Sequence, residues 1–129
     1  MILGIGTDIV KISRLAEALE KFGPRYADRI LAEEELAAFK QNAHPARFLA
    51  KRFAAKEAAV KALGTGFSQG ISMRHVFVSH DHRGKPELNF SQVAADFCRS
   101  QGMKQSFLSI SDEKDYAIAY VILTSGATI

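Results

Sequence analysis

The segment RFAAKEAAVKALGTG, residues 52–66, limits the possible folds more than any other part of the chain. From Ala46 to Leu63, apolar residues recur at helical spacing, and Gly64 follows them. Glycine is the usual residue just after a helix because it tolerates the left-handed backbone conformation found there. The pattern therefore predicts one long helix over residues 46–63.

Charged residues interrupt the apolar stripe of this helix, which consists of Leu49, Phe53, Val60 and Leu63. Lys56 lies near the middle of the stripe, and Arg52 and Glu57 lie towards its two margins. In one interpretation Lys56 and Arg52 extend towards solvent, and Glu57 forms an i,i+4 pair with Lys61. In the other, the charges form a ligand site. A buried charge needs a partner, so we predict that Lys56 pairs with a carboxylate inside the protein.

The rest of the chain predicts an α+β fold, with a mainly antiparallel sheet packed against helices, and one domain spanning residues 1–129. The polar turn at residues 112–115 lies between SFLSIS and YAIAYVIL and indicates a hairpin. The other predicted elements are a strand at 1–10, a helix capped by Ser13 and ending at Phe22, a helix at 32–41, short strands around 76–78 and 88–90, and a helix capped by Ser91 and running to Ser100.

Composition and charge restrict the class of protein. The longest apolar run, Tyr116 to Leu123, is far shorter than the roughly 20 residues of a membrane span, and the start MILGIGTD lacks the pattern of a signal peptide. We therefore expect a cytoplasmic protein without a membrane segment. The only cysteine, Cys98, is expected to be a small buried apolar residue. The formal net charge of +3 favours an acidic partner or an anionic ligand.

If the charged helix belongs to a ligand site, its chemistry points to phosphate and a divalent metal. Its cations would bracket an anionic ligand, Glu57 would bind the metal, and Gly64-Thr65-Gly66 would let phosphate approach the backbone. Mg²⁺ usually takes one or two protein carboxylates, so a second carboxylate is expected, and Asp8 in GIGTDIV is the best candidate.

Four segments together resemble the holo-acyl-carrier-protein synthase family of 4'-phosphopantetheinyl transferases: GIGTDIV at 4–10, RFAAKEAAVKALGTG at 52–66, GKP at 84–86 and SISDEKDYAIAYVIL near the end. The resemblance covers nearly the whole chain and implies the 4'-phosphopantetheinyl transferase fold. It also implies transfer of phosphopantetheine from coenzyme A to a serine of apo acyl carrier protein, which releases adenosine 3',5'-bisphosphate. Mg²⁺ would be the cofactor and fatty acid biosynthesis the pathway.

The resemblance implies a role for individual residues. Asp8 and Glu57 would bind the metal, and Lys61 would contact the β-phosphate; these three are the predicted catalytic residues. The base that deprotonates the serine would be Glu57 or a water on the metal, and we favour Glu57. Many relatives have a histidine where this chain has Phe107, so a mechanism that requires that histidine is not expected here.

Coenzyme A would be bound by two parts of the chain. The end of the long helix and the residues after it would hold the phosphates through Lys61, Gly64, Thr65 and Gly66, with Arg52 as a further phosphate contact. Lys85 and Pro86 would lie near the adenosine. The four histidines, His44, His75, His80 and His82, are expected at surface positions without a metal.

The family's docking surface for acidic carrier proteins, on its first helix, corresponds to Arg14, Lys21, Arg25 and Arg29. Relatives of this length form homotrimers with active sites between subunits. Small residues at 54, 55, 58 and 62 suit close packing of the long helix, either within one subunit or between two.

Two alternatives remain at this point. One is a basic module, without enzymatic activity, that binds nucleotides or nucleic acid and in which Asp8 and Glu57 are structural. The other keeps the chemistry and changes the acceptor to a carrier domain of a megasynthase. The lack of the aromatic and basic signatures of common RNA-binding modules disfavours the first.

Overall fold

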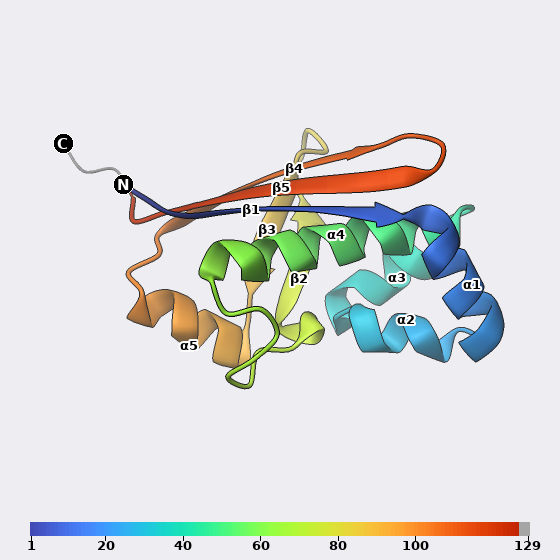
Figure 1. Ribbon diagram of the computed structural model, residues 1–129, viewed down its shortest axis with the longest axis horizontal. Coiled ribbons are helices and arrows are strands. Elements are labelled where there is room, and N and C mark those ends of the chain that lie inside the picture. Colours follow the sequence, from blue (N-terminus) through green and yellow to red (C-terminus); the bar gives the residue numbers. More distant parts are fainter. Residues whose placement is uncertain (127–129) are drawn as a thin grey trace.

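The computed structural model describes residues 1–126, and its long helix lies between a sheet and a second layer that contains the other helices and a hairpin (Figure 1). The elements in chain order are β1 (Ile2–Lys11), α1 (Ile12–Phe22), α2 (Arg25–Ile30), α3 (Glu33–Gln41), α4 (Pro45–Leu63), the 3-10 helix η1 (Met73–His75), β2 (Val76–His80), β3 (Pro86–Phe90), α5 (Gln92–Ser100), β4 (Gln105–Asp112) and β5 (Tyr116–Thr124).

The strands form two antiparallel sheets among the described residues. One has the order β1-β5-β4 and the other pairs β2 with β3. In the larger sheet the two ends of the chain come together, since Asp8 of β1 lies opposite Ala119 of β5. The α+β class and the antiparallel pairing are confirmed, and the strands are divided between two sheets.

Alternation along the strands gives the larger sheet two different faces. The face towards α4 includes Gly6, Val10, Ala119 and Val121, all of which are buried. The outer face is rich in large apolar side chains that remain exposed in the single chain: Ile5, Ile9, Phe107, Tyr116, Ile118 and Tyr120.

Helix α4 packs closely on β1 because glycines leave room for it. A Cβ atom added at Gly4 would overlap the carbonyl oxygen of Ala62, and one added at Gly6 would overlap that of Ala58. Only glycine permits such a short approach between a strand and a helix backbone. The small residues of α4 therefore pack within the chain, which answers the question that the sequence left open.

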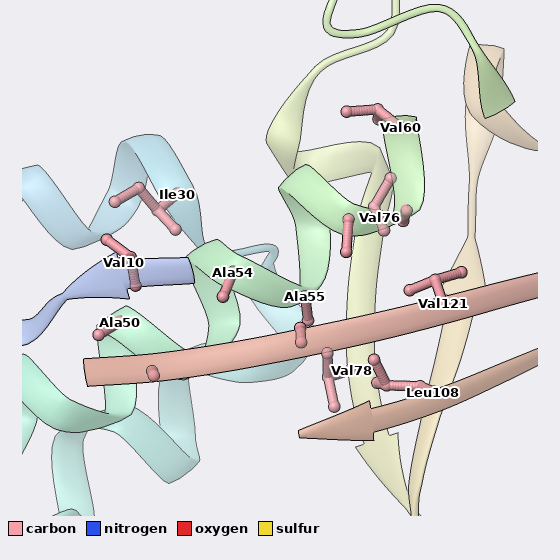
Figure 2. Close-up of a cluster of buried hydrophobic side chains, with 14 of the residues drawn as sticks. Val10, Ile30, Ala50, Ala54, Ala55, Val60, Val76, Val78, Leu108 and Val121 are labelled. Atoms are coloured by element: carbon pink, nitrogen blue, oxygen red, sulfur yellow. The ribbon is translucent and has the colours of Figure 1, made fainter. Parts of the chain in front are cut away.

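The core surrounds α4 on several sides (Figure 2). Figure 2 shows Ala55 of α4 beside Val78 of the hairpin and Leu108 of β4, and Ala54 and Val121 belong to the same cluster. Because both layers pack on α4, most of its side chains are buried, and this helix has no wide polar face.

Three local details differ from the sequence predictions. Helix α2 was not predicted. Helix α1 begins at Ile12 with Lys11 as its N-cap, so Ser13 lies in the first turn and does not cap the helix. Ser91 is the N-cap of α5, but its side chain makes no capping hydrogen bond. Gly64 ends α4 in the left-handed conformation, as predicted. Within residues 1–126, no helix is long and apolar enough to cross a membrane.

Candidate active site

Asp8, Glu57 and Lys61 come together where β1 crosses α4. The close approach at Gly4 and Gly6 brings the inner face of β1 against the helix, and Asp8 is the next residue on that face. The Lys61 ammonium donates to Asp8 Oδ1 at 3.0 Å and to the Thr7 carbonyl oxygen at 3.1 Å. The Asp8 side chain is 15% exposed and that of Lys61 is 51% exposed, so the pair lies at the protein surface.

Glu57 lies in an environment that disfavours its charged form. Partial burial raises the pKa of Glu57, and the nearby charge of Asp8 raises the pKa further, whereas Lys61 and Arg14 act in the opposite direction. The predicted Glu57–Lys61 ion pair is not formed, because Lys61 turns to Asp8. Two carboxylates and one ammonium in this arrangement can bind a cation or accept a proton.

The two carboxylates have the chemistry to bind a divalent metal. Asp8 and Glu57 are hard oxygen donors, and their mutual repulsion would be relieved by a cation between them. Lys61 provides part of that positive charge in this structure. No cluster of three or more histidine, cysteine, aspartate or glutamate side chains occurs in residues 1–126, so water and substrate oxygens would complete the coordination of Mg²⁺.

Gly64-Thr65-Gly66 forms a tight turn at the end of α4. Gly64 and Gly66 have φ values of 79° and 58°, which favour glycine. The backbone N–H groups of all three residues already donate to carbonyl oxygens at the end of α4, those of Val60 and Lys61. The turn is open to solvent, but a phosphate would not find unpaired N–H groups there.

Arg52 lies away from this site, and this placement conflicts with its predicted role as a phosphate contact. Its guanidinium is buried, and it donates to Glu35 Oε2 and to the Val78 carbonyl oxygen, both at 3.0 Å. It would have to give up a buried ion pair in order to reach a ligand. We therefore exclude Arg52 from the phosphate-binding residues.

Lys56 is fully buried and pairs with Glu35 Oε1 at 2.6 Å, which confirms the predicted carboxylate partner. Burial lowers the pKa of Lys56, and Glu35 acts in the opposite direction. The role of Glu35 could not be predicted from the sequence, because in Glu33-Glu34-Glu35 three adjacent acids all suit the start of a helix. The only sequence signal that one of these three glutamates is buried was the need of Lys56 for a carboxylate partner inside the protein.

Lys85 and Pro86 line a hollow of about 250 Å³ with Phe107, and this hollow includes none of Asp8, Glu57 and Lys61. It lies between the start of β3 and the start of β4. Lys85 is exposed, and its backbone N–H donates to Asp81. Within one chain, the two predicted parts of the coenzyme A site are therefore separate.

The four predicted docking cations are exposed on two helices. Arg14 and Lys21 lie on α1, whereas Arg25 and Arg29 lie on α2 and not on the first helix. The Arg14 guanidinium lies 5.5 Å from the ring centre of Phe53, one turn before Glu57 on α4. The basic surface thus extends from α2 to the edge of the Asp8–Glu57 site.

Three of the histidines, His44, His80 and His82, are exposed as predicted, whereas His75 is half-buried and its Nδ1 accepts a hydrogen bond from the backbone of Ser72. Cys98 is buried and free, also as predicted.

The chain is similar to known proteins over most of its length. The sequence model of the 4'-phosphopantetheinyl transferase superfamily matches residues 4–121. The holo-[acyl-carrier-protein] synthase of Halorhodospira halophila is 55% identical over 126 residues, which cover 98% of this chain and 100% of that protein.

Solved structures agree with this result. The crystal structure of holo-[acyl-carrier-protein] synthase from Neisseria meningitidis matches with a TM-score of 0.91 and 45% identity, over 96% of this chain and 99% of that one. The enzyme of Bacillus anthracis in complex with CoA (3',5'-ADP) matches with a TM-score of 0.79 and 39% identity, over 98% and 99% of the two chains. These similarities favour a transferase over a module that binds nucleic acid.

Proposed function

The chain belongs to the 4'-phosphopantetheinyl transferase superfamily, and we propose that it is a holo-[acyl-carrier-protein] synthase formed by a single domain, residues 1–129. It transfers the 4'-phosphopantetheine group of coenzyme A to a serine of apo acyl carrier protein and releases adenosine 3',5'-bisphosphate. The reaction takes place in the cytoplasm and supplies fatty acid biosynthesis. The observation that supports this most strongly is the grouping of Asp8, Glu57 and Lys61 where β1 meets α4.

Asp8 and Glu57 would hold Mg²⁺. When bound, the metal neutralises charge that develops on the phosphate oxygens during transfer. Asp8 is fixed in a paired strand, and Glu57 lies on a helix that glycine contacts hold against that strand. Both carboxylates therefore come from rigid elements, which suits a metal site that must keep its geometry.

Glu57 is our choice for the base. The serine Oγ forms a bond to the β-phosphorus of coenzyme A, the bond to the bridging oxygen breaks, and adenosine 3',5'-bisphosphate leaves with that electron pair. Glu57 accepts the proton of the serine hydroxyl. Burial and Asp8 raise the pKa of Glu57 in the metal-free chain; a metal held by both carboxylates would lower it again, so the choice of Glu57 rests on its place beside Asp8 and not on its basicity.

Lys61 and the turn after it would hold the phosphates of coenzyme A. The ammonium of Lys61 is half-exposed, so it can exchange Asp8 for a phosphate oxygen when the metal occupies the carboxylates. Thr65 and the glycines on either side of it would contact the ligand by van der Waals packing and not by backbone hydrogen bonds, since their N–H groups are already paired. Lys85 and Pro86 would border the adenosine end.

The acidic carrier protein would dock on Arg14, Lys21, Arg25 and Arg29. This choice is supported by their exposure on neighbouring helices and by the contact of Arg14 with Phe53, beside Glu57. A negatively charged partner on this surface would present its serine to the carboxylates. Such contacts raise the association rate and weaken as salt is added.

A homotrimer with active sites between subunits would bring the two parts of the coenzyme A site together. The outer face of the large sheet exposes Ile5, Ile9 and Ile118, and an apolar surface of this kind is typical of a subunit interface. Phe107 belongs both to this face and to the hollow beside Lys85. A neighbour that packs on the face would therefore also border the hollow.

Intact-mass spectrometry of an apo acyl carrier protein, incubated with coenzyme A and the purified chain, tests this function. We expect a mass gain equal to one phosphopantetheine group when Mg²⁺ is present, and no gain in excess EDTA. Carrier domains of megasynthases in parallel reactions compare the acceptors. If no acceptor gains mass although the protein is folded, the proposed function is wrong.

A further inference from the structure

Lys56 lies at the centre of a buried charge cluster that the transfer chemistry does not use. Its side chain has no exposed surface, and its ammonium has three acceptors. These are Glu35 Oε1 at 2.6 Å, the Ile30 carbonyl oxygen at 2.5 Å and the Met73 carbonyl oxygen at 3.0 Å. A side chain so placed cannot touch substrate, so any effect on function must act through the elements that it joins.

The cluster joins five elements, three of them through Glu35 and two more through Lys56. One carboxylate oxygen accepts from Lys56 and from the backbone N–H of Ala32 at the start of α3. The other accepts from Arg52 of α4 and from the backbone N–H of Val78 in β2. Lys56 adds the end of α2 and the 3-10 helix through the carbonyl oxygens that it binds.

Helix α4 does not depend on Lys56 for its place on the sheet. It is 19 residues long and is held against β1 by the contacts at Gly4 and Gly6. Those contacts involve the Ala58 and Ala62 carbonyl oxygens, next to Glu57 and Lys61. The side chains of Glu57 and Lys61 thus lie in the part of α4 that the glycine contacts hold on β1.

Helix α2 packs on the core through Ala27 and Ile30, and its last residue is also tied to Lys56. It has six residues, too few for a helix that is stable by itself. The ammonium of Lys56 binds the carbonyl oxygen of Ile30, the last residue of α2, and pairs with Glu35 in the first turn of α3. Arg25 and Arg29, two of the four proposed docking cations, are exposed on this short helix.

We propose that Lys56 is a positioning residue for the carrier protein: through Ile30 and Glu35 it fixes α2, and so it sets where Arg25 and Arg29 meet the acidic partner. This proposal rests on the proposed function. It separates the docking surface from the transfer site, because loss of Lys56 changes the position of α2 and leaves Asp8, Glu57 and Lys61 in place.

Steady-state kinetics of Lys56→Met test the proposal. Methionine keeps the unbranched shape, and Arg52 remains as the partner of Glu35. We expect KM for the carrier protein to rise roughly tenfold, the effect of losing about 1.4 kcal/mol of binding, whereas kcat and KM for coenzyme A stay within about twofold. A fall in kcat with unchanged KM for the carrier protein would overturn the proposal, as would an equal rise of both KM values.

Lys51→Met is the matched control, because Lys51 lies on the same helix, is 38% exposed and reaches only Asp112, at 3.9 Å. All three kinetic constants should keep their wild-type values in this variant. If Lys56→Met does not fold, Lys56→Gln is the second variant, since its amide keeps a hydrogen-bond donor on an unbranched side chain.

Hydrogen–deuterium exchange without substrates separates this proposal from the proposed function. Faster exchange in residues 25–35 of the Lys56 variant, with wild-type exchange in residues 57–63, would support the positioning role even if the wild type transferred nothing. Unchanged exchange in residues 25–35 would overturn it, as would faster exchange throughout α4.

Discussion

At the scale of single residues, Glu57 has the chemistry that the reaction needs at some cost to the folded state. Folding partly buries this carboxylate and brings it close to Asp8, and both effects raise its pKa. A carboxyl whose pKa is higher in the folded protein than in the unfolded chain binds more protons when folded. Its contribution to stability therefore falls as pH rises through that interval.

Glu57→Gln should consequently stabilise the protein at neutral pH. Above the raised pKa, wild type has a charged Glu57 and the variant does not, so the variant should have the higher Tm. Below the usual value of 4.5 both side chains are neutral, and the difference should vanish. Thermal unfolding of both proteins at pH 7.5 and pH 4 measures this. A lower Tm for the variant at pH 7.5 would contradict the assigned environment of Glu57.

Single residues also show how far sequence reasoning reaches. The need of Lys56 for a buried carboxylate followed from its place on an apolar stripe, and Glu35 confirms it. Arg52, on the same helix, was assigned to phosphate, yet it shares Glu35. Helical spacing gives the side of a helix on which a residue lies, but it does not tell which of two adjacent cations faces the core and which faces a ligand.

At the scale of elements, the contact between β1 and α4 is what assembles the carboxylates. The strand approaches the helix closely enough for Asp8 to lie beside Glu57 only because Gly4 and Gly6 have no side chains. The backbone carbonyl groups of Ala58 and Ala62 belong to a helix and cannot move aside easily. A glycine in this strand therefore affects both stability and the site.

Gly6→Ala should damage both properties together. The added methyl group would overlap the Ala58 carbonyl oxygen, and overpacking of this kind typically costs about 1–3 kcal/mol. Denaturant unfolding measures the free energy of unfolding, and initial rates of transfer measure the site. Thr7→Ser, at the adjacent outer-face position, should leave both nearly unchanged. Wild-type stability and rate in Gly6→Ala would show that the close contact is not essential.

The elements themselves were predicted with uneven success. Long periodic segments predicted α4 and α5, and strand patterns on either side of polar turns predicted the β2–β3 and β4–β5 pairs. Helix α2 was missed because six residues after Gly23-Pro24 show less than two turns of any periodic pattern. Ala27 and Ile30 pack it on the core and Lys56 binds its last carbonyl oxygen, and these tertiary contacts are not visible in local sequence. As a result, Arg25 and Arg29 were assigned to the wrong helix.

At the scale of the whole molecule, the outer face of the large sheet is the surface on which we propose that subunits meet. Apolar side chains occupy most of the exposed positions of β1 and β5, including Ile9 opposite Ile118, whereas Thr7 and Lys11 are polar. The same alternation that buries Val121 places Ile118 outside. The sequence alone shows this alternation. The structure adds that, within residues 1–126, the face remains uncovered by any other element.

Ile118→Lys should disrupt the assembly and the activity together. A charge in the middle of the apolar face would have to be buried at the interface, which is strongly unfavourable. Size-exclusion chromatography with light scattering should give a trimer for wild type and a monomer for Ile118→Lys. Val93→Lys, at an exposed apolar position on α5, should remain a trimer. A monomeric and active wild type would contradict the assignment of this face.

The most direct test of the central claim is the rate of phosphopantetheine transfer, measured by intact mass of the carrier protein, in Asp8→Asn, Glu57→Gln and wild type. Glu33→Gln, the same exchange at an exposed carboxylate, is the control. We predict that both site variants lose at least about a hundredfold in rate, the scale of a missing group that stabilises transition-state charge, while Glu33→Gln keeps the wild-type rate. Transfer at the wild-type rate by Asp8→Asn or Glu57→Gln would contradict the claim that these carboxylates form the active site.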